Sequence, residues 1–227
     1  MTILKPYRFY PKAEIEARAN DLLLLMQQRG DNFAPSWPFD ASKVADFLDL
    51  GLVWGTIPAD EEGLIAARII PHLRQIEINE YIIDKPQGYQ ESTIAHEIGH
   101  WVLHVNHDVV DRLGNYLETP DTPSDPFVCR PGNTQSQNTS VEWQAQYFAS
   151  CLLMPKYILQ EKTEGRDLSN WHNLYQIKDE LGVSISNLTL RLQDLGWIYI
   201  VAGTKKIYVN KLLGGDDRLP IPARSLI

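Results

Sequence analysis

The chain has 227 residues, 44% of them hydrophobic, which is enough for one sizeable domain or for one domain with a small module. Its formal net charge of -8 argues against a general nucleic-acid coat protein. The two cysteines, Cys129 and Cys151, are far apart in the sequence and in no C-x-x-C pair, which argues against a disulfide framework and fits a reducing compartment.

No stretch of the sequence predicts export or membrane insertion. Residues 1–10 lack the apolar core of a signal peptide, and the leucine run at 22–25 is far too short to span a bilayer. We therefore expect a soluble, cytoplasmic protein without a membrane partner.

The first half of the chain predicts two helices followed by a small sheet. Apolar residues at helical spacing predict a helix over 12–29 that ends at Gly30, and a second helix that begins at Asp40 or Ser42 and ends at Gly51. Strands are predicted over the segments 52–57, 63–70 and 74–79.

The last of these strands alternates in polarity, with Ile76 and Ile78 on one face. An exposed strand edge offers unpaired backbone groups to an extended peptide. We therefore expect the edge near residues 74–79 to hold a substrate.

Residues 93–100 contain the sequence His-Glu-x-x-His. In a helix, His96 and His100 lie one turn apart on the same face, where two neutral imidazoles can bind one zinc ion. Glu97 lies beside them and can act as a general base without being a ligand. Gly99 is a poor helix former, so its presence predicts that another element approaches closely. The alternative is a core helix with two hydrogen-bonded histidines, but burying these groups without a metal would be costly.

A catalytic zinc site needs a third protein ligand. Leu103 and Asn106 stand where the metzincin pattern requires Gly and His, so that pattern is absent. Glu142 opens a helix predicted over 141–154. Ala145 and Ala149 on the same face would let this helix lie close to the helix that carries His96 and His100. We therefore predict Glu142 as the third ligand, with a simple role in balancing the helix dipole as the alternative.

Other acidic residues compete less well for this role. Asp108 and Asp111 follow His100 too closely, and Glu118 lies in a proline-rich stretch that would hold a ligand poorly. Gln146, one turn after Glu142, is predicted to hydrogen-bond a ligand.

Several further residues are candidates for contact with the site or with substrate. His104 lies one turn beyond His100 and could support a ligand, contact substrate or pack in the core. A donor to the developing oxyanion could come from the side chains of Tyr147, Tyr116 or His172. Cys129 could fold back as an inhibitory thiolate ligand, although most lone cysteines are small apolar residues.

The rest of the chain predicts one long loop and a small C-terminal module. The segment 107–140 is rich in proline and polar residues and predicts a loop that includes His107. Helices are predicted over 171–181 and 186–195, followed by a hairpin of residues 198–201 and 206–209. Arg191 is the sole basic residue of the second helix, so protein recognition is favoured over DNA binding.

Two stretches together, Ile94–His104 and Glu142–Pro155, resemble the ImmA/IrrE family of metallopeptidases. Weaker likeness extends the match over residues 12–200. The resemblance implies an α+β fold: a mostly helical, zincin-like metallopeptidase domain with a small sheet at 1–160. A helix-turn-helix-like module with a small hairpin follows at 161–213, and a tail at 214–227. The sequence departs from the family at residues 90–92, at Gln146, where Asn or Asp is usual, and in its long loop.

The resemblance also implies a function. It makes His96 and His100 zinc ligands, Glu142 the third ligand and Glu97 the general base of a cytosolic zinc metalloendopeptidase. The implied substrate is a transcriptional repressor of the helix-turn-helix type, whose cleavage switches on a stress-response or mobile-element regulon. Mn²⁺ or Fe²⁺ could replace Zn²⁺. The alternative is a non-proteolytic DNA- or repressor-binding regulator with a structural metal, which would not need Glu97.

Overall fold

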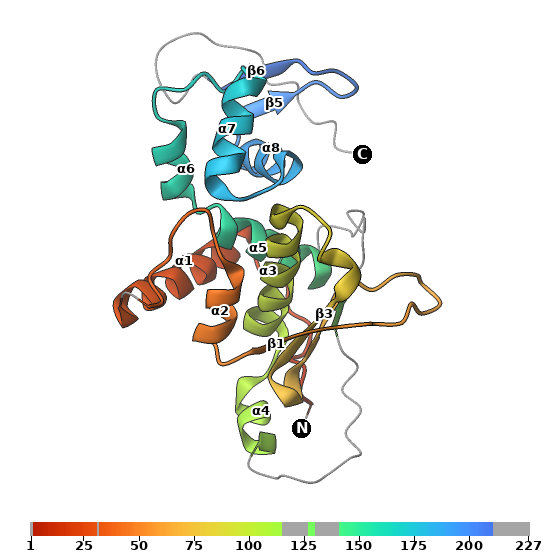
Figure 1. The fold of residues 1–227 in the computed structure, drawn as a ribbon. Coiled ribbons are helices and arrows are strands. Elements are labelled where there is room, and N and C mark those ends of the chain that lie inside the picture. Colours follow the sequence, from red (N-terminus) through yellow and green to blue (C-terminus); the bar gives the residue numbers. More distant parts are fainter. Residues whose placement is uncertain (1, 31, 115–126, 130–140, 211–227) are drawn as a thin grey trace.

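A computed structural model of the chain describes residues 2–30, 32–114, 127–129 and 141–210 (Figure 1). It shows a helix-rich α+β fold with two small sheets, as expected. The helices are α1 (Lys12–Arg29), α2 (Ala41–Phe47), α3 (Gln87–His104), α4 (His107–Gly114), α5 (Val141–Leu153), α6 (Lys156–Thr163), α7 (Trp171–Leu181) and α8 (Ile185–Asp194). The strands are β1 (Gly51–Gly55), β2 (Ala67–Ile70), β3 (Gln75–Asn79), β4 (Phe127–Cys129), β5 (Ile198–Ile200) and β6 (Ile207–Val209), and short 3₁₀ turns occupy Pro71–Leu73 and Glu80–Ile82.

Several elements differ from those predicted: the strand predicted over 63–70 begins at Ala67, and helix α6 has no counterpart among the predicted elements. Helix α2 ends at Phe47, and Gly51 begins strand β1 rather than ending the helix. The segment 107–114, predicted as loop, is helix α4, and His107 begins it with its ring stacked on Trp101 at a centroid distance of 4.8 Å. This helix buries Val109 and Val110. The short apolar face that they form stabilises the helix against the core, although the longer segment is polar in composition.

The larger sheet has the order β1-β3-β2-β4. Strand β3 pairs in parallel with β1 and antiparallel with β2, so both of its edges are occupied. The expectation that the 74–79 strand offers a free edge to substrate is therefore wrong. Its alternation arises because Ile76 and Ile78 are buried on one face, and a central strand with one covered face shows this pattern as well as an edge strand does.

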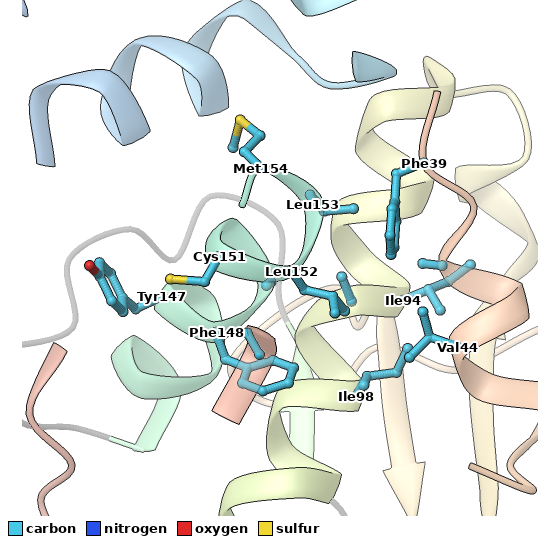
Figure 2. Packing of buried hydrophobic residues seen from close by; sticks show 14 of the residues in the cluster. Phe39, Val44, Ile94, Ile98, Tyr147, Phe148, Cys151, Leu152, Leu153 and Met154 are labelled. Carbon is cyan, nitrogen blue, oxygen red and sulfur yellow. The ribbon is translucent and has the colours of Figure 1, made fainter. Parts of the chain in front are cut away.

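Helix α3 is the centre of the fold, with the larger sheet on one side and α5 on the other (Figure 1). Ile94 and Ile98 of α3 are buried in a core continuous with the sheet residues. Figure 2 shows Phe148 and Leu152 of α5 turned toward α3, while Val44 of α2 approaches α3 from the other side. Burial of α3 on several faces explains why it is apolar around most of its circumference.

The contact between α3 and α5 depends on Gly99, as its position in the sequence predicted. A Cβ atom at Gly99 would lie 2.8 Å from the backbone oxygen of Ala145 and 3.0 Å from its Cα atom. Only glycine therefore allows the two helix backbones to approach this closely, which brings the start of α5 against the His-Glu-x-x-His segment.

Gly99→Ala should lower the free energy of unfolding by about 1–3 kcal/mol, because the new methyl group overlaps backbone atoms that cannot rotate away. In a helix without this contact, the same change would stabilise by about 1 kcal/mol. Thermal or urea unfolding measures the difference, with Gln160→Ala on the exposed face of α6 as a control that should change stability by less than about 0.5 kcal/mol. A Gly99→Ala protein more stable than the parent would contradict the proposed close contact.

The C-terminal helices pack directly on the start of α3. A Cβ atom at Gly88 would lie 2.7 Å from the backbone carbon of Val183, in the turn between α7 and α8, and Asn187 donates a hydrogen bond to the Ser92 hydroxyl (3.1 Å). The buried apolar cluster runs without interruption from Ile15 of α1 into α7 and α8. The predicted hairpin is present as the antiparallel pair β5–β6.

Arg191 is fully buried and does not face solvent. Its guanidinium donates hydrogen bonds to the carboxylate of Glu16 (2.6 Å), to the backbone oxygen of Met154 (3.2 Å) and to the hydroxyl of Tyr147 (3.3 Å). The residue on which DNA binding by α8 would have depended is therefore engaged inside the protein.

Candidate metal centre

Three side chains of types that can bind a metal ion converge where α5 begins against α3. His96 and His100 lie one turn apart on α3, and Glu142 lies in the first turn of α5. The two histidine Nε2 atoms are 3.0 Å apart, and the Glu142 carboxylate oxygens lie 3.1 Å from His96 Nε2 and 3.3 Å from His100 Nε2. Of the residues described, these three form a group whose donor atoms all lie within 4.8 Å of one another.

These separations fit a single tetrahedral ion. Zinc binds histidine nitrogen and carboxylate oxygen at about 2.0–2.2 Å, so two ligand atoms of a tetrahedron stand about 3.3 Å apart. The distances among His96, His100 and Glu142 are within a few tenths of an ångström of that value. The group can therefore occupy three corners of a tetrahedron and leave the fourth to water or substrate.

The protonation states also suit a divalent cation. Burial lowers the pKa of His100 to about 4, so its imidazole is neutral near pH 7, the form that binds metals. Burial opposes ionisation of Glu142, but hydrogen bonds with His100 and His96 outweigh it and hold the pKa of that carboxyl well below its usual range. The group therefore offers an anionic carboxylate and uncharged imidazole nitrogen to a cation.

Glu97 is fully buried next to this group. Neither of its carboxylate oxygens has a hydrogen-bond partner of ordinary geometry within the described part of the chain, and the backbone of Ile69 contributes only a weak interaction. Burial and then the negative charge of Glu142 raise the pKa of Glu97 well above its usual value. An unpaired buried carboxylate is costly, so a water molecule or a cation beside it would stabilise the fold.

Two side chains orient the histidine rings. The Nδ1 atom of His96 lies 3.3 Å from Gln146 Oε1, and the Nδ1 atom of His100 lies 3.1 Å from His104 Nδ1. Burial, followed by the nearby His100, lowers the pKa of His104 to about 3, so this ring is neutral and its Nδ1 can accept a hydrogen bond from an N–H at Nδ1 of His100. With Nδ1 of each ring engaged in this way, the Nε2 atoms of His96 and His100 are the ones that face Glu142 and would be available to a metal ion.

Several other candidates lie elsewhere. The Tyr147 hydroxyl bonds to Arg191, and Figure 2 shows its ring on the side of α5 turned away from α3. His172 is exposed on α7 beside Gln176, and Asp111 forms an ion pair with Arg74 (3.0 Å). Tyr116 and Glu118 lie outside the described residues, as does the side chain of Cys129.

The backbone of Ile69 in β2 is a part of the site that the sequence did not indicate. It contacts Glu97 through main-chain atoms, so its side chain carries no signal of this role.

A family model described as IrrE N-terminal-like domain, a peptidase family, matches residues 50–193. The chain belongs to this family. The match confirms the resemblance drawn from the sequence and indicates a metallopeptidase, and its range contains the three converging residues and Glu97.

A solved structure described as a Mycobacterium tuberculosis transcriptional regulator is 15% identical, with a TM-score of 0.46. The match covers 81% of this chain and 52% of that one, so this chain spans about half of the regulator's length. None of the curated proteins compared matches the chain.

Proposed function

We propose that this member of the IrrE-like family is a zinc-dependent endopeptidase in which His96, His100 and Glu142 bind the metal and Glu97 is the general base. The observation that carries the proposal is the convergence of three donors at tetrahedral spacing beside a buried carboxylate to which the described residues offer no hydrogen bond of ordinary geometry. A purely structural metal site would have no use for that carboxylate. Its presence favours peptidase activity over a non-proteolytic regulator.

Each residue of the site has a distinct task in hydrolysis. A bound zinc ion, or Mn²⁺ or Fe²⁺ in its place, would polarise the scissile carbonyl and lower the pKa of the attacking water. Glu97 accepts the proton of that water as the oxygen adds to the carbonyl carbon, and then delivers it to the leaving nitrogen. His104 and Gln146 hold the two histidine rings in place throughout.

The proposed substrate is a transcriptional repressor of the helix-turn-helix type, cleaved in the cytoplasm to switch on a stress-response or mobile-element regulon. In this view residues 1–160 are the zincin-like domain, and α7 and α8 within 161–213 form a helix-turn-helix-like module that recognises protein. The turn between these helices supports the assignment, with Gly182 at φ 73° and the Ser184 hydroxyl accepting a hydrogen bond from the Asn187 amide (3.1 Å). Leu190, 56% exposed on α8, suits a protein surface better than a phosphate backbone.

Reconstitution tests this function. The full chain loaded with zinc should cleave a helix-turn-helix repressor encoded in a neighbouring reading frame, lose activity with a chelator and regain it on addition of zinc, as followed by mass spectrometry of the fragments. None of the helices described is long and apolar enough to cross a membrane. Failure to bind stoichiometric metal, or cleavage that persists without metal, would contradict the proposal.

A further inference from the structure

Strand β4 covers the outer edge of β2. It comes from a segment between α4 and α5, far from β2 in the sequence, and pairs antiparallel with Ile69 opposite Phe127, Arg68 opposite Val128 and Ala67 opposite Cys129. Prolines at positions 126 and 131 flank the segment in the sequence. The strand itself has only three residues, so a few ladder hydrogen bonds at most hold it in place.

The edge of β2 is the one that runs past the candidate metal centre. The backbone of Ile69 lies against Glu97, and β4 itself lies beside α3, which carries both histidines. The open edges of the described sheet belong to β1, which is separated from β2 by β3, and to β4, whose outer edge lies one strand farther from Ile69. An extended peptide that reached Glu97 by adding to this sheet would therefore pair with β2.

Peptides commonly bind proteins by adding a strand to an open sheet edge, where backbone hydrogen bonds fix their position. Antiparallel pairing with β2 would hold a peptide extended beside Glu97. The register of β4 places Phe127 opposite Ile69, at the point where β2 meets Glu97.

We propose that β4 is a built-in competitor that occupies the position of the substrate on β2 and must leave before an extended peptide can bind. The inference rests on the proposed peptidase function and adds a means of regulation to it. A three-residue strand is short enough to be displaced, so β4 would lower the activity of the enzyme without abolishing it. A substrate that pairs well with β2 would displace β4 and so relieve the inhibition.

The first arm of the test removes the competitor. Replacing Phe127, Val128 and Cys129 together by glycine weakens the strand, while Val128→Ile keeps it and serves as the matched control. The probe is a fluorescent peptide of residues 124–132 with serine at position 129, and its binding is followed by anisotropy in zinc-loaded, full-length protein that carries Glu97→Gln to prevent cleavage. The triple-glycine protein should bind about tenfold more tightly than the parent if β4 occupies β2 about nine-tenths of the time.

The second arm locks the competitor in place. Ala67→Cys puts a thiol opposite the native Cys129, and oxidation can then tie β4 to β2. The remaining thiol, Cys151, is fully buried and burial raises its pKa to about 12, so it does not compete for oxidation. The oxidised protein should lose peptide binding at least about tenfold and recover it on reduction, whereas Ala67→Ser should respond to neither treatment.

Binding that is equal in the folded triple-glycine and parent proteins, or unaffected by the confirmed 67–129 bridge, would overturn the proposal and make β4 a structural strand. If the triple-glycine protein fails to fold, the comparison of peptide binding by the oxidised and the reduced Ala67→Cys protein decides the question. Peptide binding is measured in Glu97→Gln proteins and does not depend on catalysis. If the binding results are as expected but the corresponding proteins with intact Glu97 cleave no peptide, the proposed peptidase function is wrong, while the proposal that β4 occupies the peptide position on β2 still holds.

Discussion

Glu97→Gln should lower the rate of peptide hydrolysis by about 10²–10⁴-fold, the usual contribution of a general base. Glutamine has nearly the same shape but cannot accept the proton of the attacking water. Metal content should stay close to that of the parent, because the three converging donors are His96, His100 and Glu142. Activity assays with elemental analysis of the same protein sample measure both quantities.

The matched control for this substitution is Glu161→Gln, which makes the same chemical change on the exposed surface of α6. It should leave both turnover and metal content unchanged. Parent-like turnover in the Glu97→Gln protein, or loss of its metal, would remove Glu97 from the role of general base.

Glu142→Ala should lose metal affinity and activity together. The loss in affinity should exceed the roughly 10–100-fold that follows from removing a residue that only supports a ligand. Gln146→Ala provides that comparison, because Gln146 contacts His96 at 3.3 Å without belonging to the converging group. Competition with a chromogenic chelator gives the affinity of each variant for zinc.

Glu118→Ala is the control for the third ligand, since Glu118 is the competing acid from the segment before α5. Its zinc affinity should match that of the parent. Full occupancy in Glu142→Ala combined with an empty site in Glu118→Ala would transfer the ligand role to Glu118.

Local patterns in the sequence predicted much of the candidate site. The spacing of His96 and His100 places both on one helix face. Gly99 indicated that another element approaches this helix closely, because a glycine inside a helix needs a compensating contact, and α5 is that element. The small residues after Glu142 pointed to the same contact. These inferences succeeded because each depends on residues within a few turns of one another.

The features that the sequence did not predict depend on long-range pairing. Strand order decides which edge is free, and no local pattern shows that β3 is central or that β4 covers β2. Arg191 looked like a surface base because its partner Glu16 lies 175 residues away. Helix α4 was not predicted from the sequence, because its short apolar face is followed directly by proline-rich residues that make the composition of the whole segment typical of a loop.

The buried contact of Arg191 also limits how the protein can be dissected. Arg191 of α8 forms an ion pair with Glu16 of α1 (2.6 Å), and Asp194 of α8 forms one with Lys12 of α1 (2.6 Å). These two ion pairs hold α1 and α8 together. A fragment that ended near residue 160 would leave the Glu16 carboxylate without its guanidinium partner and expose the apolar faces on which α7 and α8 rest. The contribution of the C-terminal helices is therefore better measured with surface substitutions such as Leu190→Ala in the intact chain than with truncated proteins.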